Sequence, residues 1–121
     1  MRREELYLKD IIEAGEAIHK FLSGVKKSAF LTNDLLRSAV LQKLSVIGEA
    51  AARLPLKFRK SHPEIPWEDI IGFRNIAVHA YFAVDWSIVW VSATRETPEL
   101  GRMISGILAR EFPEVGGPKE R

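Results

Sequence analysis

Residues 66–81 read PWEDIIGFRNIAVHAY, and this stretch predicts a helix that carries both apolar and chemically reactive side chains. Pro66 suits the first turn of a helix, and Glu68 and Asp69 follow it where the helix dipole favours acidic groups. Apolar residues then recur along the stretch at helical spacing. They are Trp67, Ile70, Ile71, Phe73, Ala77 and Val78. The stretch therefore indicates a helical fold.

The sequence before this stretch predicts two further helices. One apolar or small stripe, formed by Leu8, Ile11, Ile12, Gly15, Ile18 and Leu22, places a first helix over about residues 4–22. Thr32, Asn33 and Asp34 are residues that favour the N-cap, and apolar positions follow them at helical spacing as far as Leu54. Pro55 ends this second helix or begins a short one.

The sequence after residue 81 is also expected to be helical. Asp85 is placed to cap a helix, and the β-branched run from Ser87 to Thr94 lacks the alternation and the hairpin turn of a strand. Thr97-Pro98 breaks or kinks that helix, and a last apolar helical run follows. We therefore predict an all-α bundle of four main helices plus a short helix. It forms a single domain over residues 1–112, with a flexible C-terminal tail over residues 113–121.

Composition excludes several classes of protein. The 121 residues are 46% hydrophobic and 28% charged, an ordinary globular balance, and they include no cysteine, which excludes disulfides, thiolate catalysis and Cys-ligated metal sites. No apolar run approaches the roughly 20 residues that span a bilayer, and the N-terminus lacks a signal peptide, so we expect a cytoplasmic protein without a membrane partner. The net charge of +2 leaves any case for nucleic-acid binding to local clusters.

Four polar side chains stand out in the last two turns of the stretch: Arg74, Asn75, His79 and Tyr81. At about 100° per residue, Asn75 and His79 share a face, whereas Arg74 lies about 140° round from His79. Helix geometry alone therefore does not force the guanidinium and the imidazole together.

These groups have the chemistry needed to cleave RNA without a metal. An imidazole takes or gives a proton near neutral pH, a guanidinium grips a phosphate and its transition state, and an amide orients either group. The 2′-hydroxyl of RNA attacks its own phosphate, leaving a 2′,3′-cyclic phosphate and a 5′-hydroxyl. DNA lacks that hydroxyl and does not react this way.

A purely structural interpretation stays open from spacing alone. A lone histidine on an apolar helix is more often a hydrogen-bonded structural residue, and Arg74 could pair with a carboxylate such as Glu49 or Asp69. Asn75 could hydrogen-bond a neighbouring loop. No two histidines have a metal-ligand spacing such as H-x-x-x-H, and there is no glycine-rich phosphate loop, so we expect neither a metal nor another cofactor.

The segment from His62 to Trp90 resembles the HepT-like branch of the HEPN superfamily, small helical toxins encoded beside minimal nucleotidyltransferase antitoxins. Arg74, His79 and Tyr81 fit the R-x-x-x-x-H-x-Y signature of that family. The likeness covers most of the chain, about residues 8–110. Its flanks are His62-Pro63-Glu64-Ile65-Pro66-Trp67, Ile70, Gly72, Phe73, Phe82, Val84, Asp85, Val89 and Trp90, with Ile47-Gly48-Glu49-Ala50 upstream.

The resemblance implies a HEPN-type up-down bundle that acts as the toxin of a type VII-like toxin–antitoxin pair. Family members are homodimers whose signature helices face each other across the two-fold axis, with RNA in the cleft between them. Arg74 and His79 would carry the catalytic roles, with Asn75 as the polar residue after the arginine. Tyr81 would be the residue that the nucleotidyltransferase modifies with AMP, which blocks RNA. The alternative is a non-catalytic helical partner that presents a substrate to a nucleotidyltransferase.

Two other sets of side chains have a possible link to RNA. Lys57, Arg59 and Lys60 could contact RNA phosphates, although a basic run of this kind is more often a solvated helix face. The three tryptophans could stack on bases, but at helical positions among Ile and Val we favour a place in the core or in a dimer interface. They are Trp67, Trp86 and Trp90.

Overall fold

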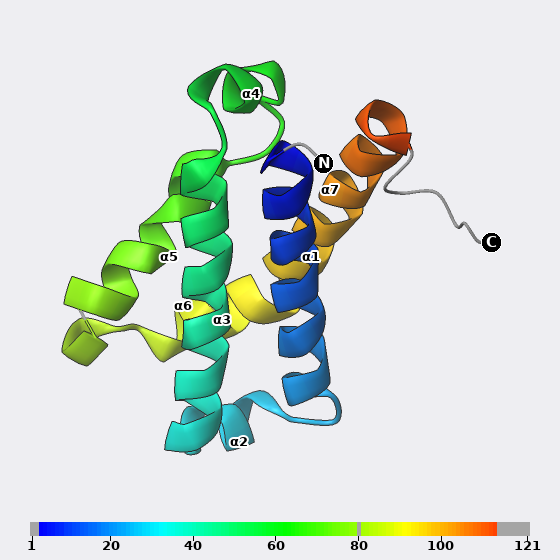
Figure 1. Ribbon diagram of the computed structural model, residues 1–121. Coiled ribbons are helices and arrows are strands. Elements are labelled where there is room, and N and C mark those ends of the chain that lie inside the picture. The colour runs from blue at the N-terminus through cyan, green and yellow to red at the C-terminus, as the bar shows by residue number, and fades with distance from the viewer. Residues whose placement is uncertain (1–2, 80, 114–121) are drawn as a thin grey trace.

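The computed structural model describes residues 3–79 and 81–113, with the side chains of residues 77–79 and 81 left out of the description. All the secondary structure in these residues is helical (Figure 1), which confirms the predicted all-α bundle. The four long helices are α1 (Arg3–Leu22), α3 (Asp34–Arg53), α5 (Trp67–His79) and α7 (Thr97–Glu111). Within the described residues, none of the helices combines the length and the apolar character that crossing a membrane requires.

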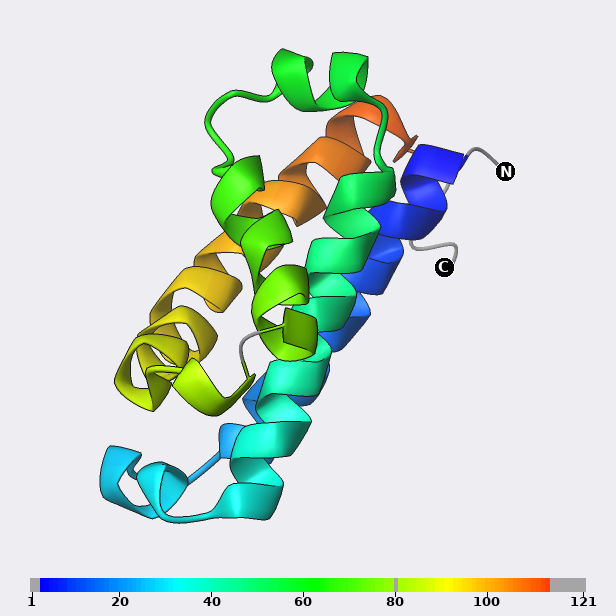
Figure 2. The same ribbon diagram turned by 90° about the vertical axis from the view of Figure 1, so that its left-hand side faces the viewer.

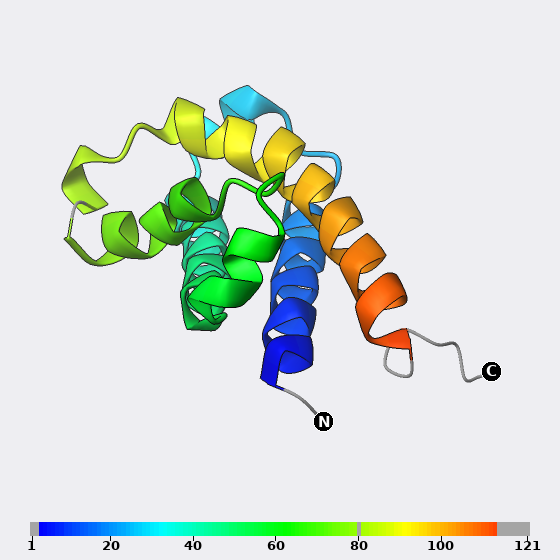
Figure 3. The same cartoon turned by 90° about the horizontal axis from the view of Figure 1, so that it is seen from above.

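The long helices lie side by side around a central pair. α1 and α3 run antiparallel at the centre, α5 packs against the outer side of α3, and α7 packs against α1 (Figure 1). Seen from above, the segment that leads into α7 runs across the face of this pair that points away from the viewer in Figure 1 (Figure 3). α3 is thus the element on which α5 is positioned.

Short elements connect the long helices: α2 (Lys27–Leu31), α4 (Leu56–Ser61), η1 (Tyr81–Ala83), α6 (Trp86–Val91) and η2 (Ser92–Glu96). α2 has no counterpart among the predicted helices, because five residues are too few to show a helical period. Its role lies in Phe30, which is fully buried against the rings of Trp86 and Trp90. The predicted tail lies outside the described residues apart from Pro113.

The core is formed by apolar stripes from all four long helices. Its largest fully buried side chains are Leu8, Ile11, Ile18, Phe30, Val40, Leu54, Ile104 and Ile107. Trp67 is buried, and Trp86 and Trp90 pack against the core. Trp67 therefore lies in the core, one of the two places predicted for the tryptophans, and Trp86 and Trp90 are partly buried at its edge.

The helical path continues through the predicted break at Thr97-Pro98. Proline has no backbone N–H to donate, and Pro98 falls in the first turn of α7, where that donor is not needed. The preceding residues Ser92–Glu96 form a π-turn, in which the backbone N–H and the hydroxyl of Thr97 both donate to the carbonyl of Ser92. The chain is therefore helical from Trp86 to Glu111.

Candidate active site

The start of α5 is fixed by a tryptophan anchored on the preceding turn. The indole N–H of Trp67 donates to the carbonyl of His62 at 3.0 Å, and the backbone N–H of Trp67 donates to the carbonyl of Ile65 at 2.9 Å. The helix then runs without interruption to His79. Arg74, Asn75 and His79 thus lie on one helix, and Tyr81 is the first residue of η1.

A glycine on α3 sets how closely α5 approaches. A Cβ atom at Gly48 would lie 2.8 Å from the carbonyl oxygen of Ile70 and 3.2 Å from the backbone nitrogen of Arg74. Real Cβ atoms do not come within 3.0 Å of such an atom. The two helices therefore touch backbone to backbone, and the contact runs from Ile70 to Arg74.

The next residue of α3 pairs with the Arg74 side chain. Nη1 of Arg74 donates to Oε1 of Glu49 at 3.3 Å, and both side chains are about half exposed, at 39% and 44%. Of the two carboxylates that spacing allowed, the structure selects Glu49. Asp69 lies instead at the edge of a groove between α3, α5 and α7.

The same carboxylate also accepts from a second arginine, which sequence reasoning did not identify. Nε of Arg53 donates to Oε2 of Glu49 at 3.0 Å. The hydrogen bond to Glu49 raises the pKa of Arg53, and a hydrogen bond to Tyr7 raises it further. Glu49 thus joins two guanidinium groups, one on its own helix and one on α5. The spacing of four residues between Glu49 and Arg53 was the available signal.

The remaining members of the predicted catalytic set are only partly described. Asn75 is exposed, one residue beyond Arg74, and the backbone of α5 places positions 75 and 79 one turn apart. The side chains of His79 and Tyr81 lie outside the described residues.

The predicted basic run lies at the other end of the molecule. Lys57 and Lys60 are exposed on α4, and Arg59 is half-buried, with its Nε donating to the carbonyl of Leu54 at 3.2 Å. α4 caps the end of the bundle at which α5 begins, whereas Arg74 lies in the second half of α5 (Figures 1 and 2). A single chain therefore does not bring this run together with Arg74.

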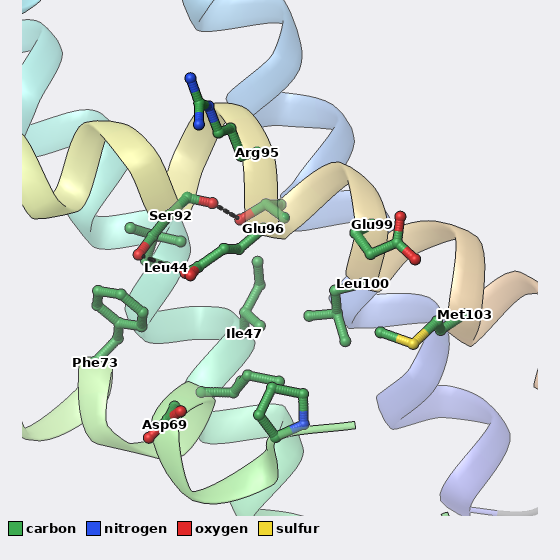
Figure 4. Close-up of a pocket in the computed structure, with 13 residues that line it drawn as sticks. Leu44, Ile47, Asp69, Phe73, Ser92, Arg95, Glu96, Glu99, Leu100 and Met103 are labelled. Carbon is green, nitrogen blue, oxygen red and sulfur yellow. Dashed lines mark hydrogen bonds between the residues drawn. The ribbon is translucent and has the colours of Figure 1, made fainter. Parts of the chain in front are cut away.

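A separate groove lies between α3, α5 and the segment formed by η2 and α7. It has a volume of about 400 Å³ and a largely apolar lining. Figure 4 shows Leu44, Ile47, Phe73 and Leu100 converging on it, while Ser92 and Glu96 hydrogen-bond to each other above it. Its lining includes no histidine, so we place the candidate active site at Arg74. Among the described side chains, no three His, Asp or Glu residues gather closely enough to hold a metal ion.

Comparison with protein families gives one match that covers most of the chain. The model of the family described as "Ribonuclease HepT-like" matches residues 11–107, a range that includes α3, α5 and the Glu49–Arg74 pair. No solved structure gives a significant match to the chain.

Individual relatives carry ribonuclease names. The chain is 37% identical to the probable ribonuclease HepT of Thermococcus cleftensis, over 82% of its own length and 90% of that protein. It is 33% identical to a protein of Caldanaerobacter subterraneus subsp. tengcongensis named as a candidate RNase, over 92% of its own length and 99% of that protein. A candidate RNase of Methanocaldococcus jannaschii is 30% identical, over 85% of this chain and 94% of the relative.

Proposed function

This chain belongs to the Ribonuclease HepT-like family, and from that membership we propose that it is a metal-independent endoribonuclease. The observation that carries the proposal is the position of Arg74. Its guanidinium is half exposed at a backbone contact between two helices and is held by one hydrogen bond to Glu49. A guanidinium has five N–H donors, so this bond leaves donors over for a phosphate.

In the proposed reaction the RNA supplies its own nucleophile. The 2′-hydroxyl attacks the neighbouring phosphorus, the P–O5′ bond breaks, and the products are a 2′,3′-cyclic phosphate and a 5′-hydroxyl. Arg74 binds the phosphate and stabilises the extra negative charge of the transition state. His79 accepts the proton of the 2′-hydroxyl or gives one to the leaving oxygen, and Asn75 orients these groups.

We extend the proposal to a toxin role in the cytoplasm, with a nucleotidyltransferase as the antitoxin partner. Transfer of AMP from ATP to the hydroxyl of Tyr81, with release of pyrophosphate, would place a phosphate and a nucleotide beside the site, where they repel and block RNA. The active form is a homodimer whose α5 helices face each other. Lys57, Arg59 and Lys60 lie far from Arg74 of the same chain. They would therefore contact phosphates of the RNA on either side of the cleaved bond rather than the cleaved phosphate itself.

A non-catalytic partner of a nucleotidyltransferase is the second candidate. The presence of arginine, histidine and tyrosine together in the signature favours the ribonuclease, because a scaffold that only presents a substrate does not need all three.

The decisive experiment is a cleavage assay in a metal chelator with the purified chain alone. We expect cleavage with 2′,3′-cyclic phosphate ends, a rate at least about 10²-fold lower with Arg74→Ala or His79→Ala, and no cleavage of RNA that carries 2′-O-methyl groups. If His79→Ala cleaves like the wild type, the assigned mechanism is wrong. If the wild type leaves RNA intact while its mass shows no added AMP, the non-catalytic candidate replaces the ribonuclease.

A further inference from the structure

We propose that Glu49 is a positioning residue for Arg74, and that Arg53 holds Glu49 in the rotamer that does so. The inference rests on the proposed ribonuclease function and adds a residue on a different helix to its site. Its basis is the arginine–carboxylate–arginine bridge formed by Arg53, Glu49 and Arg74, which is named the bridge below.

In the bridge, each oxygen of the Glu49 carboxylate accepts from a different arginine. Oε2 accepts from Arg53 on the same helix at 3.0 Å, and Oε1 accepts from Arg74 on α5 at 3.3 Å. The bond to Arg53 spans one helical turn and fixes the direction of the carboxylate. Oε1 is then presented to α5 directly beside Gly48, where the two backbones touch. The bridge therefore restricts the guanidinium of Arg74, while the contact at Gly48 restricts its backbone.

The negative charge of Glu49 indicates that the bridge orients Arg74 rather than strengthening the binding of RNA. Glu49 carries a negative charge at a site that is proposed to bind a polyanion, so on its own it weakens the attraction of RNA. Half-exposed ion pairs also contribute little to folding stability. A carboxylate here is thus costly for binding and nearly neutral for stability. The effect that remains is to hold a catalytic guanidinium in one direction, and misplacement of such a group by about 1 Å can cost 10²-fold in rate.

These opposing effects give a test in which binding and rate move in different directions. The rate is measured in single turnovers at saturating RNA, and affinity is measured with 2′-O-methyl RNA, which cannot react. For Glu49→Ala we expect the rate to fall about 10- to 100-fold. Affinity should stay equal or rise about threefold, because a negative charge has been removed.

Two further variants and a control separate positioning from general disruption. Arg53→Lys keeps the positive charge but replaces the planar guanidinium donor. We therefore expect a smaller loss of rate than with Glu49→Ala, and an unchanged affinity for RNA. The double variant Glu49→Ala/Arg74→Ala should be no slower than Arg74→Ala alone, since Glu49 acts through Arg74. The control is Glu99→Ala, which removes the carboxylate of a Glu–Arg pair within α7, formed with Arg102, and should change neither quantity.

Each outcome decides the inference. Cleavage by Glu49→Ala at the wild-type rate overturns the positioning role while the ribonuclease stands. Loss of rate and affinity by the same factor, or a double variant slower than Arg74→Ala, also overturns it, because Glu49 would then act on RNA or on the fold. A wild type that carries no added AMP and does not cleave RNA at all overturns the proposed function and this inference with it.

Discussion

At the scale of single residues, Arg74 owes its position to two neighbours on α3. Gly48 allows the backbones to touch, and Glu49 pairs with the side chain. A larger residue at position 48 would push α5 away and carry the guanidinium with it. The glycine and the carboxylate therefore act on the same feature, one through the backbone and the other through charge.

Substitution of Gly48 by alanine tests the backbone contact. The new Cβ would lie 2.8 Å from the carbonyl oxygen of Ile70, so we expect Gly48→Ala to lower the free energy of unfolding by about 1–3 kcal/mol. Gly72→Ala is the matched control, because nothing lies within 4 Å of its Cβ and alanine favours helices. Gly72→Ala should raise the free energy of unfolding by up to about 1 kcal/mol. Urea unfolding of both variants gives the comparison, and a Gly48→Ala protein as stable as the wild type would refute the close contact.

Substitution of Arg74 tests the proposed phosphate contact. Loss of a group that stabilises the transition state typically costs about 10²- to 10³-fold in rate, so we expect that reduction in single-turnover cleavage by Arg74→Ala. Circular dichroism should be unchanged, since the Arg74–Glu49 pair is half exposed. Arg95→Ala, which removes an exposed arginine from η2, serves as the control. Equal loss in both variants would show that net charge, not the position of Arg74, controls the rate.

Local spacing in the sequence names candidate residues but not their partners. The stretch over residues 66–81 offers Arg74, Asn75, His79 and Tyr81 as candidates, and it leaves Glu49 and Asp69 open as partners for the arginine. The choice of Glu49 depends on how α3 and α5 pack, and no local rule states that Gly48 lies opposite Arg74. Arg53 was missed because its role appears only through Glu49.

At the scale of elements, the entry to α6 depends on a single cap. Oδ1 of Asp85 accepts from the backbone N–H groups of Ser87 and Ile88 at 3.0 and 3.3 Å, which confirms the predicted N-cap. A six-residue helix has little stability of its own, so the cap matters more here than on a long helix. Because α6 leads directly into η2 and α7, its start also sets where the final helical segment begins.

Removal of this cap is expected to have a small and specific cost. Asp85→Ala should lower the free energy of unfolding by about 1 kcal/mol, since two backbone donors lose their partner. Asp85→Asn keeps the accepting oxygen and should restore most of the loss. Chemical denaturation of the three proteins measures both effects. If asparagine destabilises as much as alanine, the negative charge rather than the cap is what matters at this position.

Element boundaries were predictable where capping chemistry marks them. Asn33 caps α3 through its side chain, at the predicted cluster, and α3 ends at Arg53, one residue before the predicted limit. The π-turn at Ser92–Glu96 was not foreseen, because proline signals a disturbed helix but does not say how the chain absorbs it. α2 was missed for a related reason: Phe30 is buried by tertiary contacts with Trp86 and Trp90, which five residues of sequence do not reveal.

At the scale of the whole molecule, one chain holds its candidate groups apart. Arg74 lies on the outer helix α5, and the exposed cations Lys57 and Lys60 lie on α4 at the end of the bundle (Figure 2). On an ideal helix, Arg74 and His79 point about 140° apart. The proposed homodimer resolves this separation, because the arginine of one chain can then serve the histidine of the other.

Mixing of inactive subunits tests this arrangement. Arg74→Ala and His79→Ala chains are each expected to retain at most about 1% of the wild-type activity alone. If each site takes its arginine from one chain and its histidine from the other, a mixed dimer has one site that lacks both groups and one that is intact. Random exchange makes about half of the dimers mixed, so about a quarter of the wild-type activity should return. If each site draws both groups from one chain, every site in the mixture lacks one of them and no activity returns. Cleavage measured after unfolding and refolding the two variants together, beside each refolded alone, therefore distinguishes a shared site from two separate ones.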